Sequence, residues 1–161
     1  MKRIYVNEDT CIGCGLCRVY CQAEHSSSKD IIKAFKKEMP RPLPRVRVER
    51  KAEVSFSIQC QHCDEPWCIY FCLTGAMGRD AATGVVTVDT DKCMGCWTCI
   101  VACPYGAITR DLGRKTIAKC DMCPERDVPA CVANCPNEAL TLSEDDRGGN
   151  PLQAVSSHAG E

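Results

Sequence analysis

The sequence predicts an α+β fold made of two tandem modules, related by a pseudo-twofold repeat, in which short strands and helices surround metal clusters. Three observations predict it. The 161 residues include 16 cysteines, and those cysteines repeat one spacing four times. Only 6% of the residues are aromatic, and little more than a third are apolar once the cysteines are set aside. A chain with so small an apolar core needs disulfides or metal to hold it together.

The expected cellular compartment favours metal over disulfides. The segment Met1–Asp9 lacks the apolar stretch of a secretory signal, and no run of 18 apolar residues could form a membrane span. We therefore expect a cytoplasmic protein whose thiols stay reduced. The formal net charge of −1 becomes more negative once thiolates hold metal. This charge, and the lack of interleaved basic and aromatic residues, argue against a nucleic-acid partner.

The cysteines form four quartets, and all sixteen are candidate metal ligands. The first and third have the spacing C-x2-C-x2-C-x3-C, in which three cysteines bind one [4Fe–4S] cluster and the fourth reaches a neighbouring cluster. The second and fourth widen this loop to C-x2-C-x4-C-x3-C and C-x2-C-x7-C-x3-C. Zinc sites share the C-x2-C pair, but they do not predict the repeated C-x2-C-x2-C-x3-C spacing. The quartets are Cys11, Cys14, Cys17 and Cys21; Cys60, Cys63, Cys68 and Cys72; Cys93, Cys96, Cys99 and Cys103; and Cys120, Cys123, Cys131 and Cys135.

An internal repeat surrounds these quartets. Residues 6–14 and 88–96 both read as a short strand that enters a Cys-x-Gly-Cys turn. Gly75–Met77, Gly106–Ile108 and Glu138–Leu140 follow the later quartets in the same way. Strand, ligand loop, short helix and strand resemble the half-unit of a bacterial ferredoxin, so two pairs of halves predict two ferredoxin-like modules.

A long insertion separates the first two quartets. Ser26–Ser28 are expected to cap a helix over residues 29–37, and three prolines at 40, 42 and 44 then exclude regular structure. Residues 45–50 and 53–58 alternate with period two and predict the arms of a hairpin. Residues 84–88 predict a further strand. Between residues 33 and 51, eight Lys or Arg stand against two Glu, which indicates either a partner-docking surface or a solvated face.

Few other residues suggest a function. His62, between two ligands of the second quartet, could tune a cluster by hydrogen bonding or could simply pack. Trp67 and Trp97 lie inside ligand loops and are expected to shield clusters from water. No set of residues for acid–base or nucleophilic catalysis is visible, so we expect a chain that is not an enzyme on its own.

Residues 3–143 resemble the four-cluster, ferredoxin-like iron–sulfur subunits of the dimethyl sulfoxide reductase family, which also serve formate dehydrogenases, hydrogenases and carbon monoxide dehydrogenases. The segments Pro40–Val46 and Cys131–Leu140 look most like those of the small subunits of tungsten-dependent aldehyde oxidoreductases. The resemblance implies a large catalytic partner with a tungsten or molybdenum pterin. It also implies an acceptor, either a flavin subunit that meets NAD or a ferredoxin.

The resemblance also implies how the quartets pair, because in that family the first pairs with the fourth and the second with the third. Residues 1–21 and 104–143 would form module A, residues 60–103 module B, residues 22–59 the insertion, and residues 144–161 a disordered tail. The implied ligand sets are set 1, Cys11, Cys14, Cys17 and Cys135; set 2, Cys120, Cys123, Cys131 and Cys21; set 3, Cys60, Cys63, Cys68 and Cys103; and set 4, Cys93, Cys96, Cys99 and Cys72.

These patterns predict an electron-transfer subunit that passes single electrons through four [4Fe–4S] clusters. A free soluble polyferredoxin and a scaffold with purely structural clusters remain as alternatives. Self-association that extends the chain of clusters is a further expectation. Because the apolar core is small, we expect that the chain does not fold without its metal.

Overall fold

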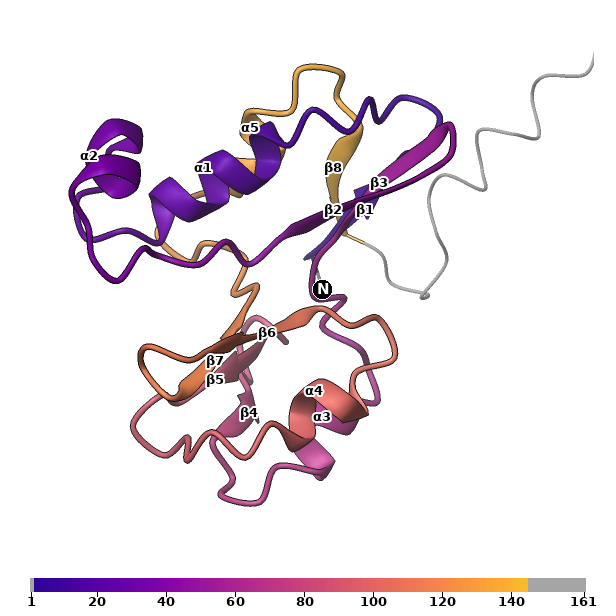
Figure 1. Ribbon diagram of the computed structural model, residues 1–161. Coiled ribbons are helices and arrows are strands. Elements are labelled where there is room, and N and C mark those ends of the chain that lie inside the picture. The colour runs from indigo at the N-terminus through magenta and orange to yellow at the C-terminus, as the bar shows by residue number, and fades with distance from the viewer. Residues whose placement is uncertain (1, 145–161) are drawn as a thin grey trace, which may run out of the picture.

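The computed structural model describes residues 2–144, and the upper lobe in Figure 1 is built from both ends of this described part of the chain. Strand β1 (Lys2–Val6) pairs antiparallel with β8 (Leu140–Glu144), so that Ile4 lies opposite Leu142. Helix α1 (Leu16–Glu24) packs against the short helix α5 (Ala130–Ala133). This lobe therefore brings the first and last cysteine quartets together.

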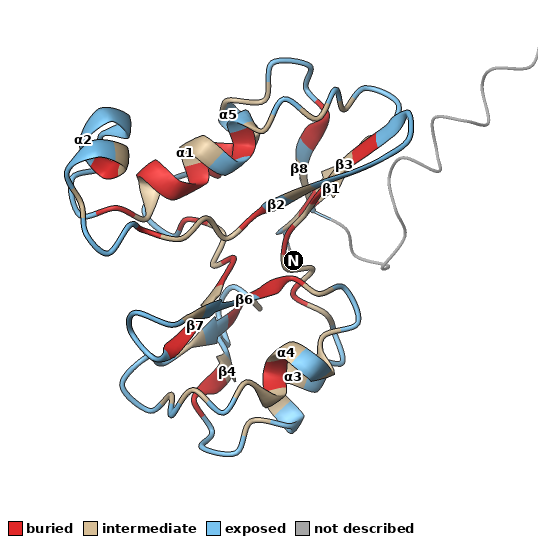
Figure 2. Ribbon diagram, in the orientation of Figure 1, coloured by how far each residue is buried: buried red, intermediate tan, exposed pale blue. Residues whose placement is uncertain are grey.

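The lower lobe contains two two-stranded antiparallel sheets and two short helices. Their packing follows the apolar residues: Met77, Val86, Ile108 and Ile117 are buried together with Cys99. Figure 2 shows these buried segments as red stretches that alternate with exposed loops. The sheets pair β4 (Met77–Arg79) with β5 (Val86–Val88) and β6 (Ile108–Asp111) with β7 (Thr116–Lys119), and the helices are α3 (Trp67–Tyr70) and α4 (Thr98–Ala102).

The boundary between the modules differs from the expected one. Residues 104–119 were assigned to module A, but β6 and β7 pack in the core of the lower lobe. The physical reason is that Ile108 and Ile117 are 4% exposed and contact the apolar side chains of β4 and β5. The lower lobe therefore extends through Lys119, and the chain crosses into the upper lobe just before Cys120.

The insertion packs on the upper lobe. The predicted hairpin is confirmed, since β2 (Arg47–Lys51) pairs with β3 (Val54–Ile58). The predicted helix is shorter, α2 (Ile31–Lys36), and the expected serine cap is wrong. The side chain of Asp30 caps it instead by accepting a hydrogen bond from the backbone of Lys33, because its carboxylate lies directly before the first turn.

The end of the described chain is a strand. The disordered tail was expected from residue 144, but Glu144 is the last residue of β8 and lies opposite Lys2. The rest of that expected tail, residues 145–161, lies outside the described residues. Within residues 2–144 the longest helix is α1 with nine residues, and none of these helices is long and apolar enough to cross a bilayer. The expected α+β fold of short strands and helices is confirmed.

Candidate iron–sulfur cluster sites

All sixteen cysteine thiols are free of disulfide bonds, and they gather in groups inside the two lobes. Three thiols of the first quartet line one cavity together with Cys135 of the last quartet. Burial, and then its thiol neighbours Cys14, Cys11 and Cys135, raise the pKa of Cys17 to about 11. These four thiols therefore share one cavity.

A second group, from α1 and the last quartet, is the most deeply buried. Burial raises the pKa of Cys120 to about 12 and that of Cys123 to about 11. The pKa of Cys131 is raised most strongly, by burial and then by Cys120, Cys21 and Cys123. Buried and crowded thiols such as these three resist ionisation unless cations are present, which is the chemistry expected of metal ligands.

The lower lobe holds two comparable groups. Burial raises the pKa of Cys68 to about 11, with further upward contributions from Cys60, Cys103 and Cys63. In the other group, burial raises the pKa of Cys99 to about 11, and the neighbouring thiols of set 4 contribute in the same direction. The thiols of set 4 also line one cavity, and they are Cys72, Cys93, Cys96 and Cys99.

Backbone N–H groups point at several of these sulfurs. The amides of Met77 and Ala107 each lie 3.4 Å from the sulfur of the preceding fourth cysteine, Cys72 and Cys103 respectively. Cys21 is not followed by a segment like those that hold Met77 and Ala107. The amide of Arg45, from the insertion, donates to the sulfur of Cys21 at 3.2 Å instead. Donors of this kind stabilise thiolates, so the groups fit metal-bound sulfur.

A left-handed backbone residue precedes the second cysteine in all four ligand loops. In two loops it is Gly13 or Gly95, as the sequence suggested, with φ values of 64° and 70°. In the other two it is His62 or Met122, with φ values of 47° and 65°. The same turn therefore recurs four times, and sequence reasoning missed two of the four because no glycine marks them.

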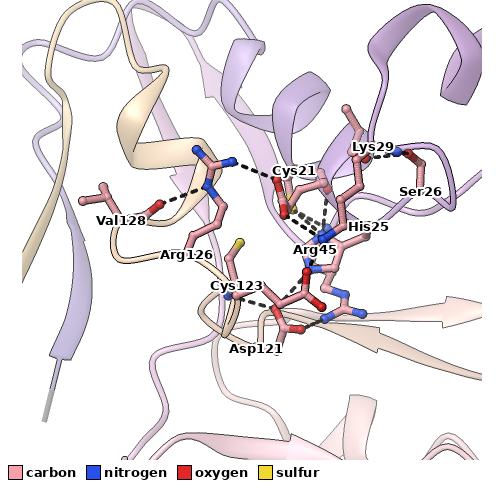
Figure 3. A network of polar contacts seen from close by, with 12 residues as sticks. Cys21, His25, Ser26, Lys29, Arg45, Asp121, Cys123, Arg126 and Val128 are labelled. Carbon is pink, nitrogen blue, oxygen red and sulfur yellow. Dashed lines mark hydrogen bonds and ion pairs between the residues drawn. The ribbon is translucent and has the colours of Figure 1, made fainter.

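A polar network joins the insertion to the last ligand loop (Figure 3). Asp121 accepts from His25 at 3.1 Å and forms an ion pair with Arg45. The Nδ1 atom of His25 lies 3.7 Å from the sulfur of Cys21. Burial opposes protonation of His25, but the hydrogen bonds with Asp121 and Cys21 raise its pKa to about 9. Sequence reasoning did not find this network, because its members lie far apart in the chain.

Comparison with known proteins identifies the family. Residues 52–145 match the 4Fe-4S dicluster domain family, and residues 4–24 match the 4Fe-4S binding domain. The electron transport protein HydN of Escherichia coli (strain K12) is 36% identical over 153 residues, which cover 85% of each chain. The chain belongs to the 4Fe-4S dicluster family.

Two further proteins resemble this dicluster protein. Protein NrfC of Escherichia coli (strain K12) is 37% identical over 147 residues, covering 87% of this chain and 64% of NrfC. A chain of the active site complex BamBC of benzoyl coenzyme A reductase is 22% identical, with a TM-score of 0.48, and the match covers 99% of this chain and 92% of that one. The ferredoxin-like fold is confirmed by the matching families, and sixteen cysteines in dicluster domains are consistent with four [4Fe–4S] clusters.

The other candidate residues of this dicluster protein have distinct environments. Trp97 directly precedes α4, packs on the lower core and lines the cavity of set 4, as expected of a shielding residue. Trp67 differs from that expectation: it is 49% exposed and its ring contacts Tyr70 and Phe71. His62 is 1% exposed and accepts a hydrogen bond from the amide of Val86, so its proton resides on Nε2.

The basic stretch divides into two kinds of residue. Arg45 pairs with Asp121, Arg47 pairs with Glu49, and Arg50 donates to the carbonyl of Ile12. The other five basic side chains are exposed, and they are Lys33, Lys36, Lys37, Arg41 and Lys51. Some of these basic side chains therefore contact the ligand loops of the protein itself, and the others face solvent.

Proposed function

We propose that this protein relays single electrons between two redox partners through four [4Fe–4S] clusters. The observation that carries the proposal is the serial order of the four thiol groups. Cys17 of set 1 and Cys131 of set 2 lie in the core of the upper lobe, and Cys60 of set 3 packs against that core. Cys68 of set 3 packs against the core of the lower lobe, which includes Cys99 of set 4. Shared cores thus link set 1 to set 2, set 2 to set 3, and set 3 to set 4.

The exposure of the thiols supports a relay with two ends. Cys14 of set 1 and Cys96 of set 4 are exposed, whereas the four thiols of set 2 are buried. A bound [4Fe–4S] cluster supplies one-electron redox chemistry. The chain's own residues hold the four sites in order, exclude water from set 2 and leave each outer site near a surface where a partner can approach.

We further propose the ligand sets 1 to 4 as given above. Their test is a pair of double variants. Cys21→Ala with Cys120→Ala removes two ligands of one proposed site, and we expect the loss of one cluster. Cys21→Ala with Cys11→Ala removes one ligand from each of two proposed sites, and we expect two clusters to be damaged. Iron analysis and electron paramagnetic resonance of the anaerobic proteins measure both, and equal losses in the two variants would contradict the pairing.

A catalytic oxidoreductase subunit is the proposed electron donor, specifically a tungsten- or molybdenum-pterin aldehyde oxidoreductase, with a flavin NAD reductase subunit or ferredoxin as acceptor. Two points support it: the resemblance carried by the motifs, and the similarity to HydN, an electron transport protein. The five exposed basic side chains of the insertion offer a docking surface. Affinity purification from the native organism should recover a large pterin protein in stoichiometric amount.

A free polyferredoxin is the second candidate, because the two exposed end thiols would suit a carrier that meets several enzymes equally well. Under that function the purified chain stays monomeric and no large subunit copurifies. Self-association is a separate proposal that sizing at several concentrations tests.

A further inference from the structure

A buried lysine lies at the crossing between the two lobes. Lys119 is the last residue of β7 and is 2% exposed. Its ammonium donates to the carbonyl of Val86 and, at 2.9 Å, to the carbonyl of Cys120. No Asp or Glu among residues 2–144 forms an ion pair with it. An ammonium has three donors and a full charge, so two carbonyls leave its charge without a counterion.

The thiol groups of sets 2 and 3, on either side of Lys119, can supply the missing negative charge once they bind metal. On one side, Lys119 directly precedes Cys120 of set 2 and donates to its carbonyl. On the other side, the Val86 residue that it holds also donates to His62, which lies between Cys60 and Cys63 of set 3. The ammonium therefore lies between the two inner thiol groups. Four thiolates around a [4Fe–4S] core give a net negative site, and reduction adds one more negative charge.

The neighbouring histidine does not supply a second positive charge. His62 accepts a hydrogen bond from the Val86 amide, while Lys119 donates to the Val86 carbonyl, so both side chains hold the same residue. Because the Nδ1 atom of His62 accepts that hydrogen bond, it carries no proton and the imidazole is neutral. Lys119 is thus a buried cation at this crossing, and His62 adds no charge to it.

We propose that the buried Lys119 ammonium is the shared counterion of the two inner clusters and favours their reduced states over those of the outer clusters. This inference rests on the proposed function, because it requires reducible clusters at sets 2 and 3. In this view an electron that enters at either end finds its most favourable position at the crossing between the lobes.

Lys92 provides a matched control. Like Lys119, it directly precedes the first cysteine of a quartet, but it is exposed and pairs with Asp89 at 2.8 Å. Its charge is screened by solvent and by that carboxylate, so its removal should have little effect on any cluster. Any effect that comes merely from losing a lysine beside a ligand should appear in both variants.

The test is a redox titration of the anaerobic holoprotein, followed by electron paramagnetic resonance, for wild type, Lys119→Gln, Lys119→Arg and Lys92→Gln. In Lys119→Gln we expect the ratio of reduced to oxidised protein at two clusters to fall about tenfold at a given potential, which is about 59 mV for one electron. Lys119→Arg and Lys92→Gln should match wild type. Unchanged potentials in a Lys119→Gln protein that holds four reducible clusters would overturn this inference and leave the proposed function intact.

Loss of clusters in the variants is also informative. If Lys119→Gln and Lys119→Met lose the two inner clusters while Lys119→Arg retains them, the requirement is for charge, which supports the counterion role. If Lys119→Arg loses them as well, the requirement is for the shape of lysine, and the counterion role is wrong. The wild-type titration separately tests the proposed function, since four clusters that cannot be reduced would contradict the relay itself.

Discussion

The residue before the second cysteine of each ligand loop is where backbone conformation matters most. It is left-handed in all four loops, although only two of them have glycine there. Gly95 shows why glycine is needed in one of these places: a Cβ atom built there would lie 2.4 Å from the carbonyl oxygen of Lys115. Gly15 has a similar φ of 76°, but nothing lies within 4 Å of such an atom, and Trp97 occupies the equivalent position in the third loop.

Replacement of Gly95 by alanine should therefore be much more damaging than replacement of Gly15. Both variants place a side chain on left-handed backbone, which costs about 1–2 kcal/mol. Only Gly95→Ala adds a collision with backbone that cannot move aside without displacing the loop between β6 and β7. We expect Gly95→Ala to lose iron and to unfold at a lower temperature than Gly15→Ala. Thermal unfolding and iron analysis of the holoproteins check this, and equal effects would contradict the collision.

At the scale of elements, the β2–β3 hairpin acts as a clamp on the first ligand loop. The buried hydroxyl of Ser55 donates to the carbonyl of Cys11 at 2.6 Å, and Arg50 donates to the carbonyl of Ile12 at 3.0 Å. These carbonyls lie in the tight loop of set 1, where the backbone has few partners of its own. The insertion therefore stabilises the outer site of the upper lobe directly.

The Ser55→Ala variant tests the clamp. Loss of the hydroxyl leaves the carbonyl of Cys11 without its partner, at a cost of about 1 kcal/mol. If that cost is expressed when the loop opens, iron should leave the holoprotein about fivefold faster in the presence of a chelator. Ser26→Ala is the control, because the hydroxyl of Ser26 is also buried and donates to a backbone carbonyl, that of Ala23, which lies outside the ligand loops. Similar rates of iron release in both variants would contradict this role of the hairpin.

At the scale of the whole molecule, the parts that sequence could predict are those that local spacing encodes. The ligand rhythm, the hairpin arms and the breaking effect of three prolines all lie within a few residues of one another. The cap of α2 was missed because Ser26–Ser28 and Asp30 are both good caps, and only the position of the first turn decides between them. The boundary near Lys119 was missed because the burial of Ile108 and Ile117 depends on residues of β4 and β5.

The charged features of the site were beyond sequence reasoning for a similar reason. His25, Arg45 and Asp121 come from a helix end, the insertion and the last ligand loop, and only the folded chain joins them. Lys92 and Lys119 look alike in sequence, since each precedes a cysteine. Burial alone distinguishes them, and burial is a property of the whole fold.

The core of the upper lobe and its closure rest on the same cysteines. Of the seven buried residues in the core of the upper lobe, four are cysteines, namely Cys17, Cys21, Cys120 and Cys131. The β1–β8 sheet must also join the two ends of the described chain, and closing so long a loop is entropically costly. Thiolate–metal bonds across set 1 and set 2 would hold these ends together, so the core and its closure rely on the same ligands.

Removal of the metal under anaerobic, reducing conditions should therefore unfold the chain rather than leave an empty fold. We expect circular dichroism to show the loss of the native spectrum and of cooperative thermal unfolding, because the remaining apolar residues are too few to offset chain entropy. Rebuilding with iron and sulfide should restore both signals, which separates reversible unfolding from damage to the thiols. An apo-chain that melts cooperatively and keeps the spectrum of the holoprotein would show that strands and helices alone suffice.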